Sequence, residues 1–212
     1  MTLERSRLYL VAGASVAAGP LVELVPELSG AGVDVVQLRE KEMEAGPMLR
    51  AAQGLALMCR SVGVPFFVND RPDVARVAGA SGVHLGQDDL PPPAARTVAP
   101  GALIGWSTHS VEQIDDVLSW EERPDYVAVG PVFATPTKPG RPATGVDLLR
   151  YAAKTIPSDL PWFAIGGIDE ANLPEVVDAG ARRIVVVRAI ADAADPAEAA
   201  AGLRAILDDA PL

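Results

Sequence analysis

The sequence is poor in cysteine, histidine and aromatic residues. Of 212 residues, one is cysteine and two are histidine, and aromatic residues make up 5%. The single thiol, Cys59, excludes a disulfide within the chain, and its apolar helical surroundings favour a buried small hydrophobe over a nucleophile. His84 and His109 lack the spacing of zinc ligands, so we expect hydrogen-bonded structural roles for them at the rim of a site. A zinc centre and a serine–histidine triad are therefore not expected.

Long apolar runs and excess positive charge are also missing. No run approaches the ~20 apolar residues that a membrane span needs, and no secretory-signal pattern opens the sequence. We therefore expect a soluble, cytoplasmic protein. The formal net charge of −10 argues against nucleic acid or an anionic membrane as partner. It does not exclude a small anion, because screening separates a local basic pocket from the net charge beyond about 8 to 10 Å.

What the sequence does contain is a repeated alternation of strand and helix patterns. Short apolar runs of about four to eight residues are typical of buried parallel strands, and they occur at 7–11, 33–38, 65–69, 82–85, 102–107, 126–130, 162–165 and 184–187. Apolar residues spaced by three and four predict helices between them, at 21–28, 47–61, 72–78, 93–98, 111–120, 146–155, 172–179 and 197–207. Eight such units predict an α/β fold, a (β/α)8 TIM barrel forming one domain over residues 1–212.

Polar or glycine-containing clusters stand at the ends of most predicted strands. The clusters are QLREK (37–41), NDR (69–71), HLGQDD (84–89), GWSTHS (105–110), GPVFATPTK (130–138), IGGI (165–168) and VVR (186–188). In a (β/α)8 barrel every strand delivers its last residues to the same mouth. The clusters therefore predict one active-site rim.

Acidic residues end two neighbouring strands. Asp70 follows the third predicted strand, and Asp88 and Asp89 follow the fourth. Mg²⁺ typically takes one or two protein carboxylates and completes its shell with water and phosphate oxygens. The alternative is that these aspartates cap the following helices. We expect that one of Asp88 and Asp89 caps a helix and that the other binds the metal.

Basic and amide side chains lie on the same predicted rim. They are Gln37, Arg39, Lys41, Asn69 and Lys138. Converging guanidinium, ammonium and amide donors suit a diphosphate, with a metal neutralising the remaining charge. Taken singly, each basic residue is also compatible with a solvated loop charge.

The last two strands end in residues suited to a second phosphate. Gly166 and Gly167 follow the seventh strand, and Val187 and Arg188 follow the eighth. Barrels commonly hold a phosphate in these loops through backbone amides that glycine lets approach closely. A glycine pair also serves a plain tight turn, and Arg188 could instead turn outward toward Asp192 or Asp195. Thr135 and Thr137 add candidate hydroxyl donors.

The motifs QLREK, FFVNDR, GVHLGQDD, GPVFATPTK and AIGGI resemble, in order and spacing, those of the thiamine-phosphate synthase family, from Leu8 to Ile206. The resemblance implies a transferase of thiamine biosynthesis that joins 4-amino-2-methyl-5-hydroxymethylpyrimidine diphosphate to a thiazole phosphate, carboxylated or plain. It implies that the pyrimidine diphosphate is bound by Gln37, Arg39, Lys41, Asn69 and Lys138, with Ser107 beside its ring; Arg39, Lys41 and Lys138 would assist catalysis. It implies Mg²⁺ on Asp70 and Asp89, and the thiazole phosphate on Thr135, Thr137, Gly167, Val187 and Arg188. Arg188 departs from the small hydroxyl residue expected in many relatives.

Two other functions remain open at this stage. The related thiazole tautomerases resemble a pattern with histidine where this chain has Pro131, and without the aspartate pair at Asp88 and Asp89. A barrel that binds a phosphate ligand without turnover is the alternative from another class. The expected partners are small-molecule substrates, with no nucleic acid and no membrane, and a homo-oligomer is possible.

Overall fold

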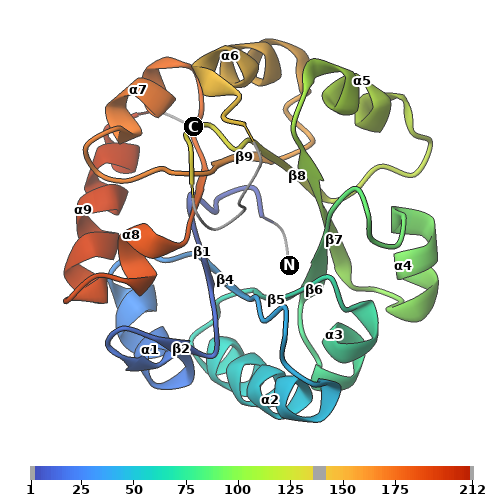
Figure 1. Ribbon diagram of the computed structural model, residues 1–212, viewed down its shortest axis with the longest axis vertical. Coiled ribbons are helices and arrows are strands. Elements are labelled where there is room, and N and C mark those ends of the chain that lie inside the picture. Colours follow the sequence, from blue (N-terminus) through green and yellow to red (C-terminus); the bar gives the residue numbers. More distant parts are fainter. Residues whose placement is uncertain (1–2, 136–141, 211–212) are drawn as a thin grey trace.

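The computed structural model describes residues 3–135 and 142–210, and it contains a closed barrel of eight parallel strands ringed by helices (Figure 1). Hydrogen-bonded neighbours follow the order β1-β10-β9-β8-β7-β6-β5-β4, and β4 pairs with β1 to close the ring. The barrel strands are β1 (Leu8–Ala12), β4 (Val35–Leu38), β5 (Phe66–Asn69), β6 (Gly82–Leu85), β7 (Leu103–Thr108), β8 (Tyr126–Val129), β9 (Trp162–Ile165) and β10 (Ile184–Val186). The predicted (β/α)8 barrel is confirmed.

Helices connect the strands and cover the outside of the ring. They are α1 (Leu21–Gly30), α2 (Ala45–Ser61), α3 (Pro72–Ala78), α4 (Pro92–Val98), α5 (Val111–Ser119), α6 (Gly145–Thr155), α7 (Leu173–Asp178), α8 (Arg188–Ala191) and α9 (Pro196–Asp208). Ser110 is the N-cap of α5, as its spacing from Gln113 predicts, and its Oγ accepts from the Gln113 amide at 3.3 Å. In a full capping box the side chain of Gln113 would accept from the amide of Ser110. Here it accepts from the amide of His109, one residue earlier.

Some short elements differ from the sequence expectation. The hairpin of β2 (Ser15–Val16) and β3 (Gly19–Pro20) and the four-residue helix α8 are too short to produce a periodic pattern. Helix α2 begins two residues before Pro47, and α4 begins at Pro92, inside a proline run that had the composition of a loop. Proline suits a first helical turn because its missing N–H has no partner there.

Two apolar layers hold the barrel together. The interior is filled by a cluster that includes Leu3, Tyr9, Phe67, Tyr126 and Phe163. A second cluster lies between the outer faces of the strands and the helices. Each strand is buried on both faces, which explains why its sequence is a continuous apolar run. Cys59 belongs to the outer layer, and burial raises the pKa of its thiol to about 12, as expected for an inert core cysteine.

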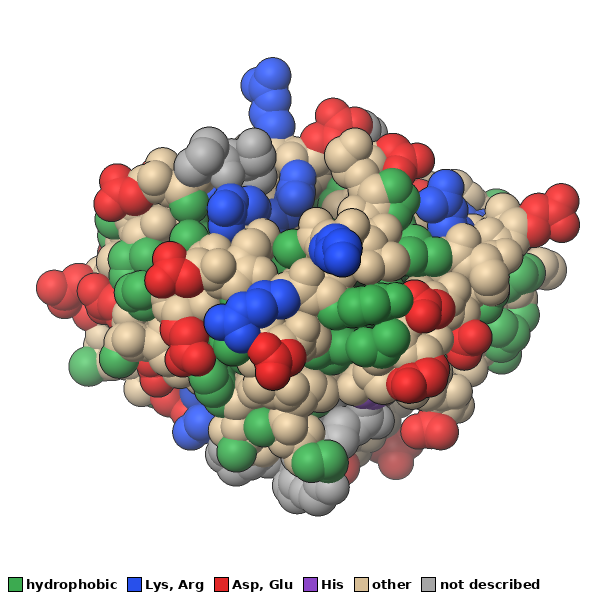
Figure 2. All heavy atoms as spheres, turned by 90° about the horizontal axis from the view of Figure 1, so that it is seen from above, with side chains coloured by type: hydrophobic (Ala, Val, Ile, Leu, Met, Phe, Trp, Pro, Cys, Tyr) green, Lys and Arg blue, Asp and Glu red, His purple; other side chains and the backbone are tan. Residues whose placement is uncertain are grey.

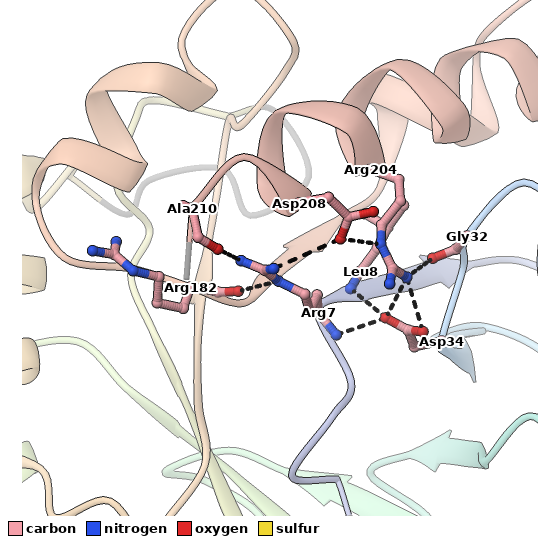
Figure 3. A network of polar contacts seen from close by, with 8 residues as sticks. All are labelled: Arg7, Leu8, Gly32, Asp34, Arg182, Arg204, Asp208 and Ala210. Atoms are coloured by element: carbon pink, nitrogen blue, oxygen red, sulfur yellow. Dashed lines mark hydrogen bonds and ion pairs between the residues drawn. The ribbon is translucent and has the colours of Figure 1, made fainter. Parts of the chain in front are cut away.

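An ionic network ties the C-terminal helix to the start of the barrel (Figure 3). Asp34 accepts hydrogen bonds from the amides of Arg7 and Leu8, at 2.7 and 3.1 Å, and from the guanidinium of Arg204. Arg204 also bonds Asp208 at 2.8 Å, and the buried Arg7 guanidinium lies 3.6 Å from the same carboxylate. The network lies at the amino-terminal end of β1, opposite the rim that carries the predicted site.

One face of the molecule carries charges of both signs (Figure 2). On the face drawn in Figure 2, lysine and arginine side chains lie among aspartates and glutamates. Within residues 3–135 and 142–210, no helix combines the length and apolar character needed to cross a membrane.

Candidate active site

The carboxyl ends of β4, β5 and β6 bring a lysine and two aspartates together. Lys41 Nζ lies 3.6 Å from Asp70 Oδ2, although the two residues follow different strands. Asp70 adopts φ 63°, the left-handed conformation that non-glycine residues rarely occupy. Its amide donates to the carbonyl of His84 at 2.9 Å, which fixes this conformation against β6. Such a strained residue at a strand end is typical of a functional position.

Asp89 faces the same group. Its Oδ2 accepts from the amide of Gly86 at 2.7 Å, which folds the loop after β6 back on itself. Burial is the main reason that the pKa of Asp89 is raised, and the neighbouring Asp70 raises it further, while the Gly86 amide and Lys41 oppose the shift. Asp70 and Asp89 therefore lie close enough to repel each other when both are ionised.

The capping alternative for the aspartates is wrong. The N-cap residues of α3 and α4 are Arg71 and Pro91, and neither helix start has a side-chain cap. Asp88 is exposed and makes no cap hydrogen bond to α4. Proline at the first turn of each helix removes an amide that a carboxylate would otherwise cap.

The chemistry of this carboxylate pair fits Mg²⁺. Among residues 3–135 and 142–210, no cluster of three or more histidine, cysteine, aspartate or glutamate side chains forms a protein-only metal cage. Two carboxylates at the barrel mouth match an ion that leaves most of its positions to water and phosphate oxygens. A divalent cation between Asp70 and Asp89 would also relieve their mutual repulsion.

The centre of the barrel mouth is a small pocket of about 40 Å³ lined by Gln37, Arg39 and Asn69, among others. Gln37 and Asn69 are nearly buried, at 2% and 7% exposure. Burial lowers the pKa of the Arg39 guanidinium, and Asp70 opposes that shift, so Arg39 lies within electrostatic range of the acidic pair. Six of the seven predicted diphosphate and metal residues thus converge on one side of the mouth: Gln37, Arg39, Lys41, Asn69, Asp70 and Asp89. Lys138 lies outside the described residues.

A chain of hydrogen bonds crosses the barrel interior beneath this pocket. Gln37 Nε2 donates to the Tyr9 hydroxyl at 2.7 Å, and the hydroxyls of Tyr9 and Tyr126 are 2.9 Å apart. His84 then bonds the Tyr126 hydroxyl through Nδ1 at 2.8 Å and Ser107 Oγ through Nε2 at 2.9 Å. The hydrogen bonding expected for His84 is confirmed, but the two tyrosines were not predicted as part of the site, because an aromatic residue inside a strand is normally interpreted as core.

A larger cavity of about 290 Å³ opens on the other side of the mouth, at the ends of β8, β9 and β10. Its walls include four of the predicted phosphate-binding residues, Thr135, Gly167, Val187 and Arg188. Thr137 lies outside the described residues. The cavity and the central pocket share Ile165, Val185 and Val187, so the two predicted substrate sites adjoin.

The glycine pair after β9 is required by close packing. Gly166 and Gly167 have φ of 106° and 67°, and a Cβ on Gly167 would come within 2.8 Å of the Cβ of Phe133. The amide of Phe133 donates to the Gly166 carbonyl at 2.9 Å, which holds the loop after β8 against the loop after β9. The same glycine pair therefore forms the tight turn and lines the cavity.

Arg188 occupies the first position of α8 and is exposed at the edge of the cavity. Within the described part of the chain it forms no ion pair with Asp192 or Asp195. Asp195 instead caps α9, accepting from the amides of Ala197 and Glu198, and Asp192 lines the cavity. The outward pairing with Asp192 or Asp195 is therefore not present among the described ion pairs.

Two further residues of the cavity wall are His109, whose expected hydrogen-bonded role at the rim is confirmed, and Pro131. His109 Nδ1 lies 2.5 Å from the carbonyl of Gly130, and Pro131 follows in the same wall. Pro131 has no titratable group, so it cannot perform the acid–base chemistry of a histidine at this position.

Comparison with known proteins identifies the family of this chain. The family model described as thiamine monophosphate synthase matches residues 8–190. The chain is 54% identical over 207 residues to a thiamine-phosphate synthase of Acidothermus cellulolyticus, with 97% of each chain covered. It is 56% identical over 173 residues to the one of Thermus thermophilus, with 82% of each covered. A thiamine phosphate pyrophosphorylase structure from Pyrococcus furiosus superposes with a TM-score of 0.84 at 32% identity, covering 96% of both chains. The chain therefore belongs to the thiamine monophosphate synthase family.

Proposed function

We propose that this protein joins 4-amino-2-methyl-5-hydroxymethylpyrimidine diphosphate to a thiazole phosphate, releasing diphosphate and thiamine phosphate. The observation that carries the proposal is the shared wall between the two sites. The polar side of the mouth offers Arg39, Lys41 and two carboxylates, while the cavity offers glycine-rich loops. Two phosphorylated substrates bound side by side would bring their reacting atoms together.

The polar side of the mouth suits departure of diphosphate. The C–O bond at the pyrimidine methylene breaks, and its electron pair leaves with the diphosphate. Arg39 and Lys41 bind and stabilise this growing negative charge, with Lys138 as the third proposed cation. Asp70 and Asp89 would hold Mg²⁺, which when bound supplies further positive charge to the diphosphate oxygens. Asn69 and Gln37 orient the substrate from the barrel interior.

The cavity suits the second substrate. Backbone amides after β9 and β10, near Gly167 and Val187, and the hydroxyl of Thr135 are the proposed ligands of the thiazole phosphate, with Thr137 and Arg188 beside them. The thiazole nitrogen then gives its lone pair to the pyrimidine methylene, forming the new C–N bond. No protein nucleophile takes part. The apolar wall of Ile165, Val185 and Val187 keeps water from the reacting carbon.

The decisive experiment is incubation of the protein with both substrates, with and without Mg²⁺, followed by chromatographic detection of thiamine phosphate. We expect product formation that requires both substrates and the metal. Isomerisation of the thiazole without thiamine phosphate would instead support a tautomerase, and tight binding without any turnover would support a ligand sensor. With a net charge of −10, we propose small molecules, not nucleic acids, as its partners; a homo-oligomer remains part of the proposal, testable by light scattering.

A further inference from the structure

The hydrogen-bond chain beneath the mouth connects two residues predicted to hold the pyrimidine. It begins at Gln37 on β4 and ends at Ser107 on β7, and between them lie only Tyr9, Tyr126 and His84. Both tyrosines are fully buried, and His84 and Ser107 are 8% and 4% exposed. The chain thus runs through the apolar interior of the barrel, where an unsatisfied hydroxyl or ring nitrogen is costly.

A glycine in the neighbouring strand leaves room for these hydrogen bonds. Gly105 lies on β7 opposite His84, and a Cβ there would clash with the ring and hydroxyl of Tyr126. The rings of His84 and Tyr126 stack at 5.6 Å with an interplanar angle of 27°. The missing side chain at Gly105 therefore leaves the space in which the Tyr126 hydroxyl reaches the imidazole.

The chain has a defined direction of donation. Gln37 Nε2 donates to Tyr9, so the single Tyr9 proton is left for Tyr126. The Tyr126 hydroxyl then donates to His84 Nδ1, because otherwise its proton would have no acceptor in the core. A neutral imidazole that accepts at Nδ1 donates from Nε2, here to Ser107. Burial raises the pKa of both phenols, which keeps each hydroxyl proton in place.

This direction determines what the two ends offer a ligand. Ser107 already accepts from His84, so its own proton is available as a donor. Gln37 uses one N–H of its amide within the hydrogen-bond chain, so its Oε1 is available as an acceptor, beside the second N–H. One donor and one acceptor match the edge of a 4-aminopyrimidine, which pairs an accepting ring nitrogen with a donating amino group.

We propose that Tyr9, Tyr126 and His84 are positioning residues that fix the donor role of Ser107 and the acceptor role of Gln37 toward the pyrimidine ring. The match to the ligand edge rests on the proposed function. The hydrogen-bond chain from Gln37 to Ser107, which we call the relay, does not depend on that function, because it is a property of the protein alone. Reversing the relay would require the Gln37 amide to rotate and every proton in the chain to move together.

A double-mutant cycle tests whether the relay acts through Ser107. Tyr126→Phe removes only the linking hydroxyl, and we expect kcat/KM for the pyrimidine diphosphate to fall about tenfold, with the thiazole KM within twofold of wild type. Ser107→Ala should cost about 10²-fold, and the double variant should be no worse than Ser107→Ala. Tyr9→Phe breaks the chain one step earlier and should lower kcat/KM in the same direction. Tyr151→Phe, which removes a tyrosine hydroxyl bonded to Asp115 on the outer surface, is the matched control and should leave activity unchanged.

The protonation of His84 provides a readout that does not depend on turnover. With two histidines in the chain, ¹⁵N-histidine spectra can be assigned by the signals missing from His84→Gln. We expect the proton on Nε2, both in the free protein and with 4-amino-5-hydroxymethyl-2-methylpyrimidine bound, and a changed signal in Tyr126→Phe.

The outcomes separate the two proposals. A wild-type protein that makes no thiamine phosphate overturns the proposed function, while an Nε2–H signal for His84 would still support the relay. An active wild type in which Tyr126→Phe and Ser107→Ala are additive, or a His84 proton found on Nδ1, overturns the relay. If Tyr126→Phe does not fold, judged by its melting transition, the cycle with Tyr9→Phe decides, and additivity there overturns the relay equally.

Discussion

Lys41 Nζ lies 3.6 Å from Asp70 Oδ2, and this contact joins a cation that we propose binds the leaving diphosphate to a carboxylate that we propose binds the metal. When a diphosphate and a cation bind together, the lysine and the aspartate can both exchange this contact for stronger ones. The two proposed binding groups, one for an anion and one for a cation, therefore lie side by side in the free protein.

The first prediction concerns the metal. Asp89→Asn retains an oxygen that can accept from Gly86 but loses the negative charge, so turnover should fall about 10²-fold or more. Added Mg²⁺ should raise the melting temperature of the wild type in the presence of diphosphate, and this increase should shrink in the variant. Asp88→Asn is the matched control, because Asp88 is the exposed residue immediately before Asp89. Equal activity of Asp89→Asn and wild type at low Mg²⁺ would count against the assignment.

The second prediction is a dependence of stability on pH. Because the folded-state pKa of Asp89 is raised, the folded protein holds this proton more tightly than the unfolded chain does. Its contribution to stability is present below the ordinary pKa of 3.8 and is lost as pH rises through the folded-state value. In EDTA, Asp89→Asn should therefore melt at a higher temperature than wild type near pH 7, and the difference should shrink as pH falls. A difference independent of pH would contradict the assigned cause.

The third prediction concerns the cations around the diphosphate. Lys41→Ala and Lys138→Ala should each lower kcat by about 10²-fold, and the double variant should lose less than the product of the two, since both act on one leaving group. Lys154→Ala, on the exposed face of α6, controls for the loss of a positive charge. An unchanged kcat with a raised KM would indicate binding of the ground state alone.

The fourth prediction concerns Arg188. Its position at the cavity edge leads us to expect that Arg188→Ala raises the thiazole KM by the equivalent of ~1.5 to 3 kcal/mol while the pyrimidine KM stays near wild type. Arg150→Ala, an exposed arginine paired with Asp147, is the control. A thiazole KM within about twofold of wild type at saturating pyrimidine would leave phosphate binding to the backbone amides.

The fifth prediction concerns stability far from the site. Asp34→Ala leaves the amides of Arg7 and Leu8 without their acceptor and frees Arg204, so it should lower the free energy of unfolding by about 2 to 3 kcal/mol. Asp147→Ala breaks an exposed pair and should cost under about 0.5 kcal/mol. Denaturant titration of both variants gives the comparison, and equal midpoints would refute a structural role for the network in Figure 3.

The sequence by itself determined the barrel and the composition of its rim. Strand and helix patterns are local, and in a parallel barrel the end of each strand reaches the same mouth, so Gln37, Arg39, Asn69 and Asp70 could be assigned to one rim from the sequence alone. The expectation of no disulfide, zinc centre or triad also came from the sequence alone, because it depended on the small numbers of cysteine and histidine residues.

The tertiary structure alone decided which side chains meet. Tyr9 and Tyr126 are 117 positions apart, and their hydroxyls bond only because barrel closure turns both inward at the same height. Asp89 lies near Asp70 and does not cap a helix, because the loop after β6 folds back through a hydrogen bond from the Gly86 amide to Asp89. Short elements such as α8 were also decided by packing, because four residues contain too few turns for a periodic signal.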